Sequence, residues 1–552
     1  MDANPDLVNV AAHLPEMARR VPDHKAIVWT VRGGYSHWTF RQLNEETDRL
    51  AHGLVHVGIQ RGMRTILMVR PSAEFFALTF ALYKIGAVPV LIDPGMGREK
   101  MVECLAGVEA EAFIGISPAH VLRVLHPRAF AGIKIVITVG RRWCWGGFRL
   151  RDLRATDARP FEMAPTSPDD PAAIIFTTGS TGPPKGVLYR HGMFDAQVRI
   201  LREHFGIQAG EVDLPTFPLF ALFDPALGMT AVIPDMDPTR PGFVDPTKII
   251  GAIRDQKVTH MFGSPALLDR VGRYGQANGV TLPTLRRVIS AGAAVSPATL
   301  ERFGSMLSGD AEIHTPYGAT EALPVACIGS REILVETRRM TDEGQGTCVG
   351  RPMPQVALRI IRIIDEPIAK WSKELVLPDG EVGEIVVKGS VVTREYLNNP
   401  RANALAKITD AGAVWHRMGD VGRLDEGGRL WFYGRKAHRV ETGRETLFTE
   451  PCEAIFNQHP IVFRSALVGM GPRGRQRPVV CVELEAGHAD TNRESVIAEL
   501  AALAQAHEHT RRIGTFLVHP RFPVDIRHNA KIFREKLAIW AEKSLGASDN
   551  PS

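Results

Sequence analysis

The sequence predicts an α/β protein with a large N-terminal domain of helix-covered, mostly parallel sheets, a β-rich subdomain, and a smaller α+β domain at the C-terminus. A chain of 552 residues exceeds what one hydrophobic core usually serves. Strand-type runs at 65–69 and 88–92 alternate with helical patterns, which favours parallel strands covered by helices. After Arg435 the pattern changes, which indicates a second unit.

The first clear element is an amphipathic helix after residue 39. Thr39 and Gln42 have the spacing of a capping box, and apolar residues recur on one helical face until Gly58. The apolar stretch 75–92 contains Lys84 and Gly86, so it reads as a helix followed by a strand. The same interruptions make it too broken to span a bilayer.

Short β-type runs at 361–364, 383–387 and 430–433 predict the β-rich subdomain, with a hairpin turn at 425–428. Beyond it we expect a helix at 450–457, a hairpin at 465–484, a helix at 493–506 and a final helix. A tail of this size matches a small independent unit. We therefore divide the chain into domains 1–436 and 437–552.

Composition excludes several classes of protein. The 44% hydrophobic and 23% charged residues are those of a globular protein, and the net charge of +5, from 66 basic and 61 acidic residues, does not imply nucleic acid. The six cysteines lack the close pairs of zinc sites or disulfide scaffolds. The first eleven residues are not those of a secretory signal, so we expect a cytoplasmic protein without a membrane span.

The strongest local signal is a loop suited to phosphate, Thr177-Thr-Gly-Ser-Thr-Gly-Pro-Pro-Lys-Gly186. It follows the apolar run 172–176 and is expected to precede a helix around 194–205. Small residues let backbone N–H groups approach an anion, hydroxyls add donors, and Lys185 supplies countercharge. Pro184 stands where a Walker loop needs glycine, so this is a different cradle. A flexible surface loop is the alternative.

Further segments resemble the adenylate-forming superfamily of acyl-CoA synthetases, peptide adenylation domains and luciferases. Ser290-Ala-Gly-Ala-Ala-Val-Ser296 is similar to its adenine-lining segment, and Tyr317-Gly-Ala-Thr-Glu321 to the segment that stacks on adenine and binds metal. His416-Arg-Met-Gly-Asp420 and Gly434-Arg435 are similar to its ribose-binding motifs. Phe522-Pro-Val-Asp-Ile-Arg-His-Asn-Ala-Lys-Ile532 is similar to its catalytic-lysine segment, which implies a mobile C-terminal domain.

The resemblance implies ATP and magnesium as cofactors. It implies nucleotide contacts from Thr177, Thr178, Gly179, Ser180, Thr181, Gly182, Lys185, Gly292, Ala293, Ala294, Tyr317, Gly318, Ala319, Asp420 and Arg435. Glu321 offers a hard oxygen to a magnesium ion shared with phosphate, and Asp420 suits two ribose hydroxyls. Catalysis is assigned to Lys531, Glu321 and Thr320, with the Lys531 cation positioned between two anionic reactants.

Within the superfamily the segments 213–228 and 234–241 resemble the β-lactone-forming branch of bacterial long-chain olefin biosynthesis. This implies adenylation of a long-chain 2-alkyl-3-hydroxy acid, then attack by its own hydroxyl to give a β-lactone, AMP and diphosphate. It also suggests association with the reductase and decarboxylase of that pathway. Candidates for the apolar pocket are Phe217, Phe220, Leu222 and Phe223, with core packing as the alternative.

Three alternatives remain: a long-chain acyl-CoA synthetase, a catalytically idle nucleotide-binding scaffold, and a peripheral membrane protein, which only the apolar substrate suggests. Ala437 stands where relatives carry a hinge aspartate or lysine, and 440–446 differs from the turn that lines a pantetheine tunnel; both weaken the thioester interpretation. The base for lactone closure is not identified, although His416 and His528 lie near motifs. Gly469-Met-Gly-Pro-Arg-Gly474 fits a dinucleotide pattern, but a strand follows it, so a hairpin turn is favoured.

Overall fold

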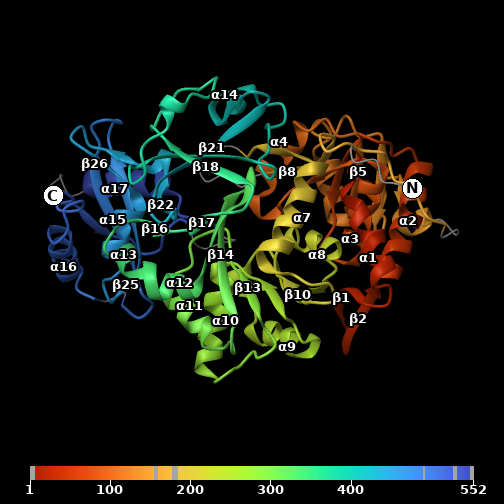
Figure 1. The fold of residues 1–552 in the computed structure, drawn as a ribbon, viewed down its shortest axis with the longest axis horizontal. Coiled ribbons are helices and arrows are strands. Elements are labelled where there is room, and N and C mark those ends of the chain that lie inside the picture. Colours follow the sequence, from red (N-terminus) through yellow and green to blue (C-terminus); the bar gives the residue numbers. More distant parts are fainter. Residues whose placement is uncertain (1–6, 155–158, 177–183, 489–490, 526–530, 547–552) are drawn as a thin grey trace.

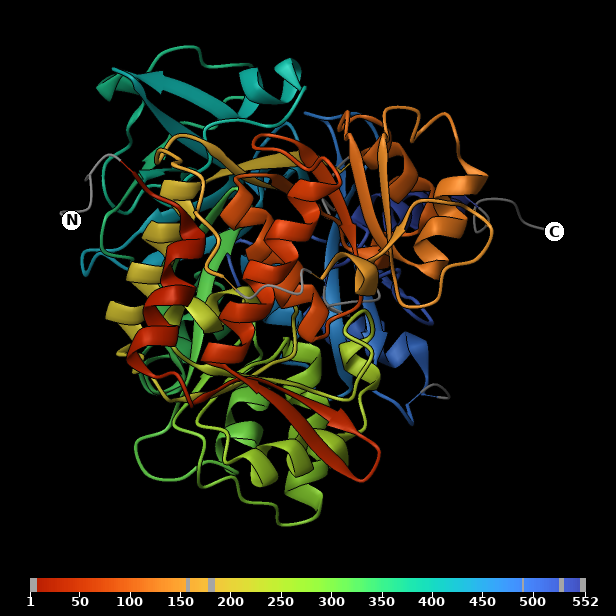
Figure 2. The ribbon, with the colours of Figure 1, turned by 90° about the vertical axis from the view of Figure 1, so that its right-hand side faces the viewer.

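The computed structural model describes residues 7–154, 159–176, 184–488, 491–525 and 531–546. Within these residues the strands form sheets of nine, seven, six, three and two members. Figure 1 shows the N-terminal elements at one end of the long axis and the C-terminal elements at the other, and Figure 2 gives the view turned by 90°. None of the helices described is both long and apolar enough to cross a bilayer.

The seven-stranded sheet has the order β7-β6-β5-β3-β4-β8-β9, and every neighbouring pair is parallel except β8 with β9. Its strands are β3 (Arg64–Met68), β4 (Val88–Leu91), β5 (Ala112–Ile116), β6 (Ile135–Val139), β7 (Phe148–Arg149), β8 (Pro171–Phe176) and β9 (Gly186–Arg190). Strands of this kind need connections that cross over the sheet, here by way of α3 (Ala73–Ile85), α4 (Arg98–Ala106) and α5 (Ser117–Leu125).

The nine-stranded sheet has the order β17-β15-β14-β13-β12-β10-β11-β1-β2 and is parallel from β14 through β1. Its strands are β1 (Lys25–Val31), β2 (Gly34–Thr39), β10 (Val212–Pro215), β11 (Thr230–Ile233), β12 (His260–Phe262), β13 (Arg287–Ile289), β14 (Glu312–Ala319), β15 (Ala322–Gly329) and β17 (Arg351–Pro352). Helices α9 (Pro246–Gln256), α10 (Pro265–Ala277) and α11 (Pro297–Gly304) connect its members, and α7 (His191–Phe205) leads into it from β9 of the seven-stranded sheet.

The two parallel sheets share a layer of helices. One hydrophobic cluster joins Phe40 and Leu43 of α2 (Phe40–His56) with Phe76 of α3, Ile114 of β5 and Ala231 of β11. The capping box of Thr39 and Gln42 is present at the start of α2, as the sequence predicts. The helix-covered parallel fold is confirmed, and the structure adds that it is built as two sheets.

The β-rich subdomain is a six-stranded antiparallel sheet. It comprises β16 (Thr347–Cys348), β18 (Val356–Ile361), β19 (Gly383–Gly389), β20 (Lys407–Asp410), β21 (Ala413–Leu424) and β22 (Leu430–Arg435). The hairpin turn at 425–428 joins β21 to β22, with Gly428 N–H donating to the Asp425 carbonyl. The expected strand at 361–364 is wrong, because β18 ends at Ile361 and the following backbone leaves the sheet to receive Arg417 and Lys436.

The C-terminal elements are those expected. They are α15 (Thr449–Phe456), the antiparallel pair β25 (Val462–Met470) and β26 (Arg477–Leu484), α16 (Arg493–Gln505), β27 (Phe516–Val518) and α17 (Arg534–Gly546). The glycine pattern 469–474 is the turn between β25 and β26, which rules out a dinucleotide loop there.

The predicted setting of the phosphate loop needs a correction. Between the loop and helix α7 lies β9, which pairs antiparallel with β8, so the loop joins two strands. The β-branched and aromatic run Val187-Leu-Tyr189 forms this extra strand on the edge of the sheet. The expected order of strand, loop and helix is therefore interrupted by β9, and α7 begins only at His191.

A buried pair of acids fixes the segment between β10 and α8 (Asp224–Leu227). Asp213 and Asp224 are both about 4% exposed and hydrogen bonded to each other. Burial raises the pKa of Asp213 to about 8 and raises that of Asp224 well above its usual value, with the Asp213 charge adding to the latter. Two neighbouring carboxyls cannot both ionise cheaply, so the pair keeps a proton at neutral pH.

This pair predicts a pH-dependent stability. Because its folded pKa values exceed the unfolded value near 3.8, its contribution is complete below about pH 4 and is lost as the pH rises toward 8. Asp224→Asn supplies a permanent donor, so its thermal midpoint should fall less than that of the wild type between pH 6 and 9. The exposed Asp23→Asn serves as control and should follow the wild type. Parallel curves for Asp224→Asn and the wild type would contradict the shared proton.

Candidate active site

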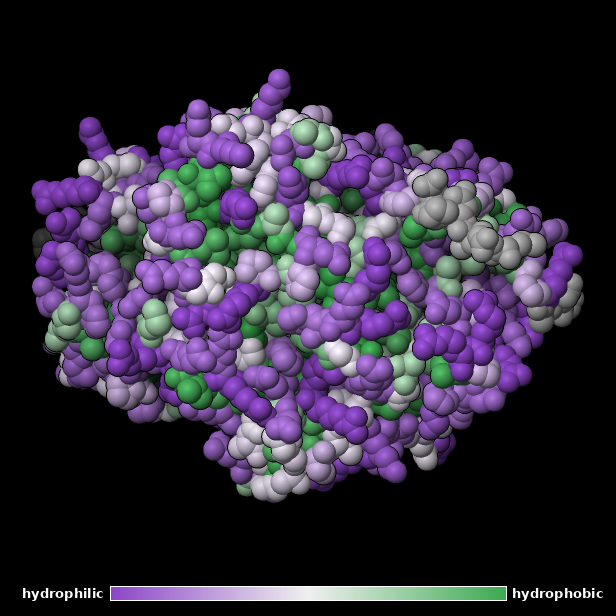
Figure 3. Space-filling view, viewed as in Figure 1, coloured by the Kyte–Doolittle hydropathy of each residue, from purple (hydrophilic) through white to green (hydrophobic). Residues whose placement is uncertain are grey.

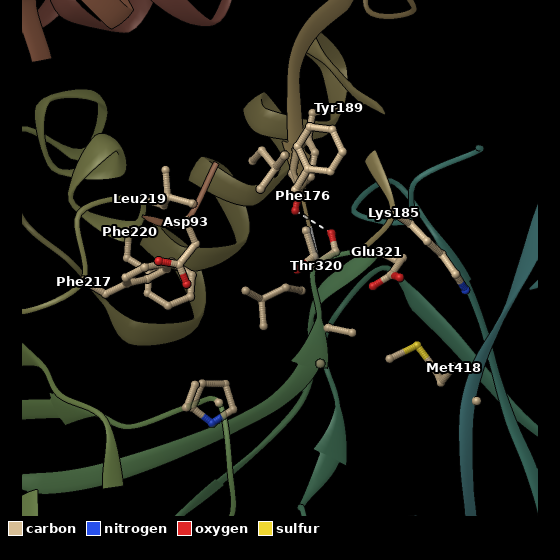
Figure 4. A pocket seen from close by; sticks show the side chains of 18 of the residues that line it. Asp93, Phe176, Lys185, Tyr189, Phe217, Leu219, Phe220, Thr320, Glu321 and Met418 are labelled. Atoms are coloured by element: carbon tan, nitrogen blue, oxygen red, sulfur yellow. Dashed lines mark hydrogen bonds between the residues drawn. The ribbon is translucent and has the colours of Figure 1, made fainter. Parts of the chain in front are cut away.

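A cavity of about 560 Å³ lies where the carboxyl ends of both parallel sheets meet the β-rich subdomain. Leu91 and Phe176 reach it from the seven-stranded sheet, and Thr216, Phe262 and Ala291 from the nine-stranded sheet. Ligands of open α/β sheets bind at this end of the strands, because the connecting loops leave room there. Figure 4 shows side chains from both sides turned into the space.

Glu321 lies at the polar end of the cavity, in the turn between β14 and β15. The Tyr396 hydroxyl donates to its Oε1 at 2.7 Å, and its backbone carbonyl accepts from Thr393 N–H at 2.8 Å. The neighbouring Thr320 carbonyl accepts from the Tyr189 hydroxyl at 2.5 Å, the dashed line in Figure 4. The carboxylate is therefore held in one direction while retaining acceptor positions.

Two lysines lie against the ring of Tyr396. Lys185 Nζ is 4.8 Å and Lys407 Nζ 5.4 Å from the ring centroid, within cation–π range. Lys407 is 8% exposed and donates to the Thr393 hydroxyl at 3.1 Å. Burial lowers the pKa of Lys407 to about 7, against the opposing effect of Glu321. Lys185, just before the start of β9, and Lys407 thus lie on the ring whose hydroxyl binds the Glu321 carboxylate.

Tyr317, Asp420 and Arg435 form a second polar group. The Tyr317 hydroxyl donates to Asp420 Oδ2 at 2.6 Å, and Arg435 pairs with Asp420 Oδ1 at 2.9 Å. Burial raises the pKa of Asp420, and the Arg435 and Tyr317 contacts oppose that effect. The Tyr317 ring lies 6.0 Å from Phe432 and is not part of the cavity lining. The three predicted residues are thus together, with Arg435 on the cavity wall.

Lys531, near the C-terminus, lines the cavity together with Lys185. Its backbone N–H donates to Asp525 Oδ1 and its carbonyl accepts from Asp525 N–H, both at 3.0 Å. Two hydrogen bonds to Asp525 therefore set the position of the Lys531 backbone. Lys185 and Lys531, about 350 positions apart in the sequence, therefore line the same cavity.

The far end of the cavity is apolar and largely aromatic. All four predicted pocket residues line it: Phe217, Phe220, Leu222 and Phe223. Phe220 packs 5.1 Å from Phe217 and 4.5 Å from Phe262 between ring centroids. Phe217 and Phe220 belong to the segment 213–224, whose two ends are joined by the hydrogen-bonded pair Asp213 and Asp224. Hydrophilic side chains cover most of the face in Figure 3, with apolar groups set between them.

Some predicted residues are placed elsewhere. Thr177, Thr178, Gly179, Ser180, Thr181 and Gly182 lie outside the described residues. Gly318, Ala319 and Thr320 line the cavity, as does Gly292, whereas Ala293 and Ala294 do not. His416 is buried beside the Ala406 carbonyl and away from the lining, and burial lowers its pKa well below the usual range. His528 lies outside the described residues.

Sequence reasoning missed Tyr396, Lys407 and Asp93. Tyr396 precedes an Asn-Asn-Pro turn and lies 75 positions from Glu321, and no spacing connects the two. Lys407 is a single lysine at the start of a strand, the usual place of a solvated residue. Asp93 follows β4 before Pro94, which reads as a turn. Only folding brings these three residues together at or beside the cavity.

The cavity suits a molecule with an anionic part and a long apolar part. The cations Lys185, Arg435 and Lys531 are at one end, and the phenylalanines are at the other. Such an arrangement can attract phosphate and carboxylate while an apolar chain is removed from water.

A family model described as AMP-binding enzyme matches residues 14–397. The chain is 51% identical to the olefin beta-lactone synthetase of Stenotrophomonas maltophilia (strain K279a), over 97% of this chain and 98% of that one. It is 50% identical, with the same coverage, to the olefin beta-lactone synthetase of Xanthomonas campestris pv. campestris.

Solved structures support the same fold. The amide bond synthetase McbA from Marinactinospora thermotolerans aligns with a TM-score of 0.79 at 22% identity, covering 96% of this chain and 99% of that one. ATP-bound MatB from Rhodopseudomonas palustris aligns with a TM-score of 0.79 at 20% identity, covering 98% and 99%. With the sequence match over most of its length, the chain belongs to the family of AMP-binding, adenylate-forming enzymes.

Proposed function

We propose that this enzyme uses ATP to adenylate a long-chain 2-alkyl-3-hydroxy acid and then closes the acyl-adenylate to a β-lactone. The observation that carries the proposal is near-full-length identity of 51% to an olefin beta-lactone synthetase. The cavity supports it, since the cation-lined end is continuous with an aromatic end. In this proposal residues 1–436 bind the nucleotide and 437–552 act as a lid.

In the first step a carboxylate oxygen of the acid attacks the α-phosphorus of ATP. An oxygen–phosphorus bond forms, the bond to the β-phosphate oxygen breaks, and diphosphate leaves. Both reactants are anionic, so Lys531 and Lys185 on the cavity wall stabilise the charge that gathers between them. In this proposal Asp420 and Arg435 hold the ribose, and Gly292 and Gly318 border the adenine.

The residues present fit a magnesium ion bound mainly by phosphate. Among the described residues no group of three or more His, Cys, Asp or Glu could form a complete cage. Glu321 supplies one carboxylate whose direction Tyr396 fixes, which is the usual protein share in magnesium–phosphate sites. When bound, the ion would neutralise phosphate charge; Glu321 would hold it, and Thr320, the preceding residue in the cavity lining, would offer a hydroxyl.

In the second step the 3-hydroxyl oxygen attacks the acyl carbon. The ring carbon–oxygen bond forms, the carbon–oxygen bond to phosphate breaks, and AMP leaves. The hydroxyl belongs to the same molecule, so it reacts at high effective concentration once the chain is bound in a bent conformation. The phenylalanine wall keeps water away from the mixed anhydride, which water would otherwise hydrolyse.

The decisive experiment gives purified protein ATP, magnesium and a long-chain 2-alkyl-3-hydroxy acid without coenzyme A. We expect β-lactone and AMP in equal amounts, identified by mass spectrometry and nuclear magnetic resonance. Coenzyme A should not raise the rate. Turnover that requires coenzyme A and yields a thioester would establish the acyl-CoA synthetase alternative.

Lys531→Ala should lower the rate of adenylation on the order of 100-fold, because a cation at the reacting oxygens is removed. The rate is measured as exchange of labelled diphosphate into ATP. Lys543→Ala, an exposed lysine in the last turn of α17, is the matched control and should keep the wild-type rate. Wild-type exchange in Lys531→Ala would remove this residue from the mechanism.

Tyr396→Phe should reduce exchange about 10- to 100-fold and raise the magnesium concentration needed for half-maximal rate, because Glu321 loses the donor that orients it. The ring remains beside Lys185 and Lys407, so the affinity for ATP measured without magnesium should change little. Tyr35→Phe removes a similar bond to Asp255 at the surface and serves as the control. An unchanged magnesium dependence in Tyr396→Phe would contradict the orienting role.

The proposal places the reaction in the cytoplasm, where ATP is made available. The reductase and decarboxylase that act on neighbouring intermediates are proposed as partners in an assembly, because an apolar β-lactone transfers poorly through water.

A further inference from the structure

A basic and aromatic segment lies outside the cavity lining and has no part in the proposed reaction. Residues 141–154 contain five arginines and one acid, so they carry a net charge of +4, whereas the whole chain carries +5. Three aromatic residues, Trp143, Trp145 and Phe148, lie among these arginines. Positive charge concentrated in one short segment indicates an anionic partner, because evenly mixed charges favour none.

The segment lies at the edge of the seven-stranded sheet. It leaves β6 after Val139, returns as the edge strand β7, and continues into α6 (Leu150–Leu153). Since β3, β4, β5 and β6 are parallel, it starts at the carboxyl edge of the sheet, the edge where Leu91 reaches the cavity. Three strand spacings, about 14 Å, separate β6 from β4. In Figure 2 the elements near residues 100–150, in orange, form an outer corner of the molecule.

The loop between β6 and β7 is held by its own contacts. The Trp145 ring stacks on the buried His120 ring at 5.1 Å between centroids, and its indole N–H donates to Thr138 Oγ1 at 3.0 Å. The Arg142 guanidinium donates to the Gly147 carbonyl. A side chain at Gly147 would collide with the backbone of β6. Trp145 therefore anchors a loop that packs closely against the sheet.

Two large apolar side chains of this loop remain exposed. Trp143 is 53% and Phe148 44% exposed. The Trp143 ring lies 5.4 Å from the anchored Trp145 ring, so it is supported from behind while it faces solvent. Exposed apolar groups that lie together and are bordered by polar residues mark a surface that another molecule covers.

The arginines around these rings outnumber the acids that could neutralise them. Asp152 accepts from Arg149 Nε at 2.6 Å and lies 3.5 Å from Arg151 Nε. The hydrogen bond from Arg149 lowers the pKa of Asp152, and the charge of Arg142 adds to the effect. One carboxylate thus faces three arginines, and Arg141 and Arg142 at the start of the loop are exposed. The segment therefore keeps an excess of positive charge at the surface.

We propose that residues 141–151 bind the surface of a membrane that contains anionic phospholipids. Arg141 and Arg142 pair with lipid phosphates, and Trp143 and Phe148 enter the headgroup region. An indole ring is favoured there because its body is apolar and its N–H is polar. A bilayer presents anionic and apolar groups together over a broad surface, which suits rings and arginines at an outer corner better than a nucleic acid strand or an acidic protein does.

The binding itself is independent of the proposed function. If both hold, membrane binding brings the carboxyl edge of the sheet, where the cavity lies, close to the lipid phase. A long-chain acid and its lactone partition into that phase, because water excludes their apolar chains.

The first test uses the full-length protein and vesicles without substrate. The protein should float with vesicles of equal parts phosphatidylcholine and phosphatidylglycerol, and should bind pure phosphatidylcholine about 10-fold more weakly or less. Added salt should weaken the binding, because the screening length falls from about 10 Å at 0.1 M to about 3 Å at 1 M. Equal binding to both kinds of vesicle, or no binding to either, overturns the proposal.

The second test changes the segment. Arg141→Gln combined with Arg142→Gln should weaken binding to the anionic vesicles on the order of 10- to 30-fold, because two charges near the lipid surface are removed. Trp143→Ala should weaken it about 10-fold through the loss of buried apolar area. The double arginine variant should also lose most of the salt dependence, whereas Trp143→Ala should keep it.

Two matched controls come from the C-terminal part of the chain. Arg511→Gln with Arg512→Gln removes the same charge from neighbouring arginines that are just over half exposed. Phe463→Ala removes a ring that is 40% exposed and lies 4.9 Å from the guanidinium of Arg464. Phe463 belongs to β25, at the opposite end of the long axis from β5 in Figure 1. Both controls should bind anionic vesicles as the wild type does.

The changed residues are outside the cavity lining, so thermal midpoints and the exchange of diphosphate into ATP, measured without vesicles, should match the wild type in every variant. Wild-type vesicle binding by both Arg141→Gln/Arg142→Gln and Trp143→Ala contradicts the proposal. So does tighter binding to a labelled single-stranded oligonucleotide or to polyglutamate than to anionic vesicles, which would assign the segment to a nucleic acid or an acidic protein. If a variant does not fold, the lipid and salt dependence of the wild type still decides.

Discussion

The arrangement around the cavity depends on the ion pairs that the Glu384 carboxylate forms with Arg417 and Lys436. This carboxylate has no exposed surface, and it binds Arg417 through both oxygens and Lys436 through one. Arg417 also donates to backbone carbonyls of Glu366 and Leu405. One anion between the buried Arg417 and the half-buried Lys436 joins β19, β21 and the segment after Arg435. Since an unpaired buried charge costs several kcal/mol, roughly 3–5 for a broken pair, these segments are held together as a unit.

The positions of Asp420 and Arg435, the residues proposed to bind the nucleotide, follow from that unit. Strand β21 carries Asp420 three residues after Arg417, and β22 ends at Arg435, one residue before Lys436. Across the cavity, parallel register brings the ends of β4 and β8 together in one sheet and the ends of β10 and β12 together in the other. A rigid polar wall thus faces the loops of two sheets, and the apolar segment between Asp213 and Asp224 closes the remaining side.

Much of this could be predicted from the sequence where residues act through local patterns. The capping box at Thr39, the turn at 425–428 and the C-terminal elements depend on neighbours in the chain, and they appear as expected. The cavity lining also contains predicted residues from distant motifs, such as Lys185, Glu321 and Lys531. What failed depends on tertiary contacts: β9 forms because β8 offers an edge, and residues 362–364 leave the sheet because Arg417 and Lys436 bind there. Tyr396 carries no spacing signal, since its partner Glu321 is 75 positions away.

The anchoring of Lys436 has a consequence for how such enzymes can be recombined. Lys436 pairs with Glu384 of β19, and Ala437 follows it in the chain. A graft that exchanges the residues from Ala437 onward while keeping Lys436 preserves the charge balance around Glu384 and Arg417. A splice point one residue earlier would import a foreign side chain into that balance, so the useful junction for chimeras lies directly after Lys436.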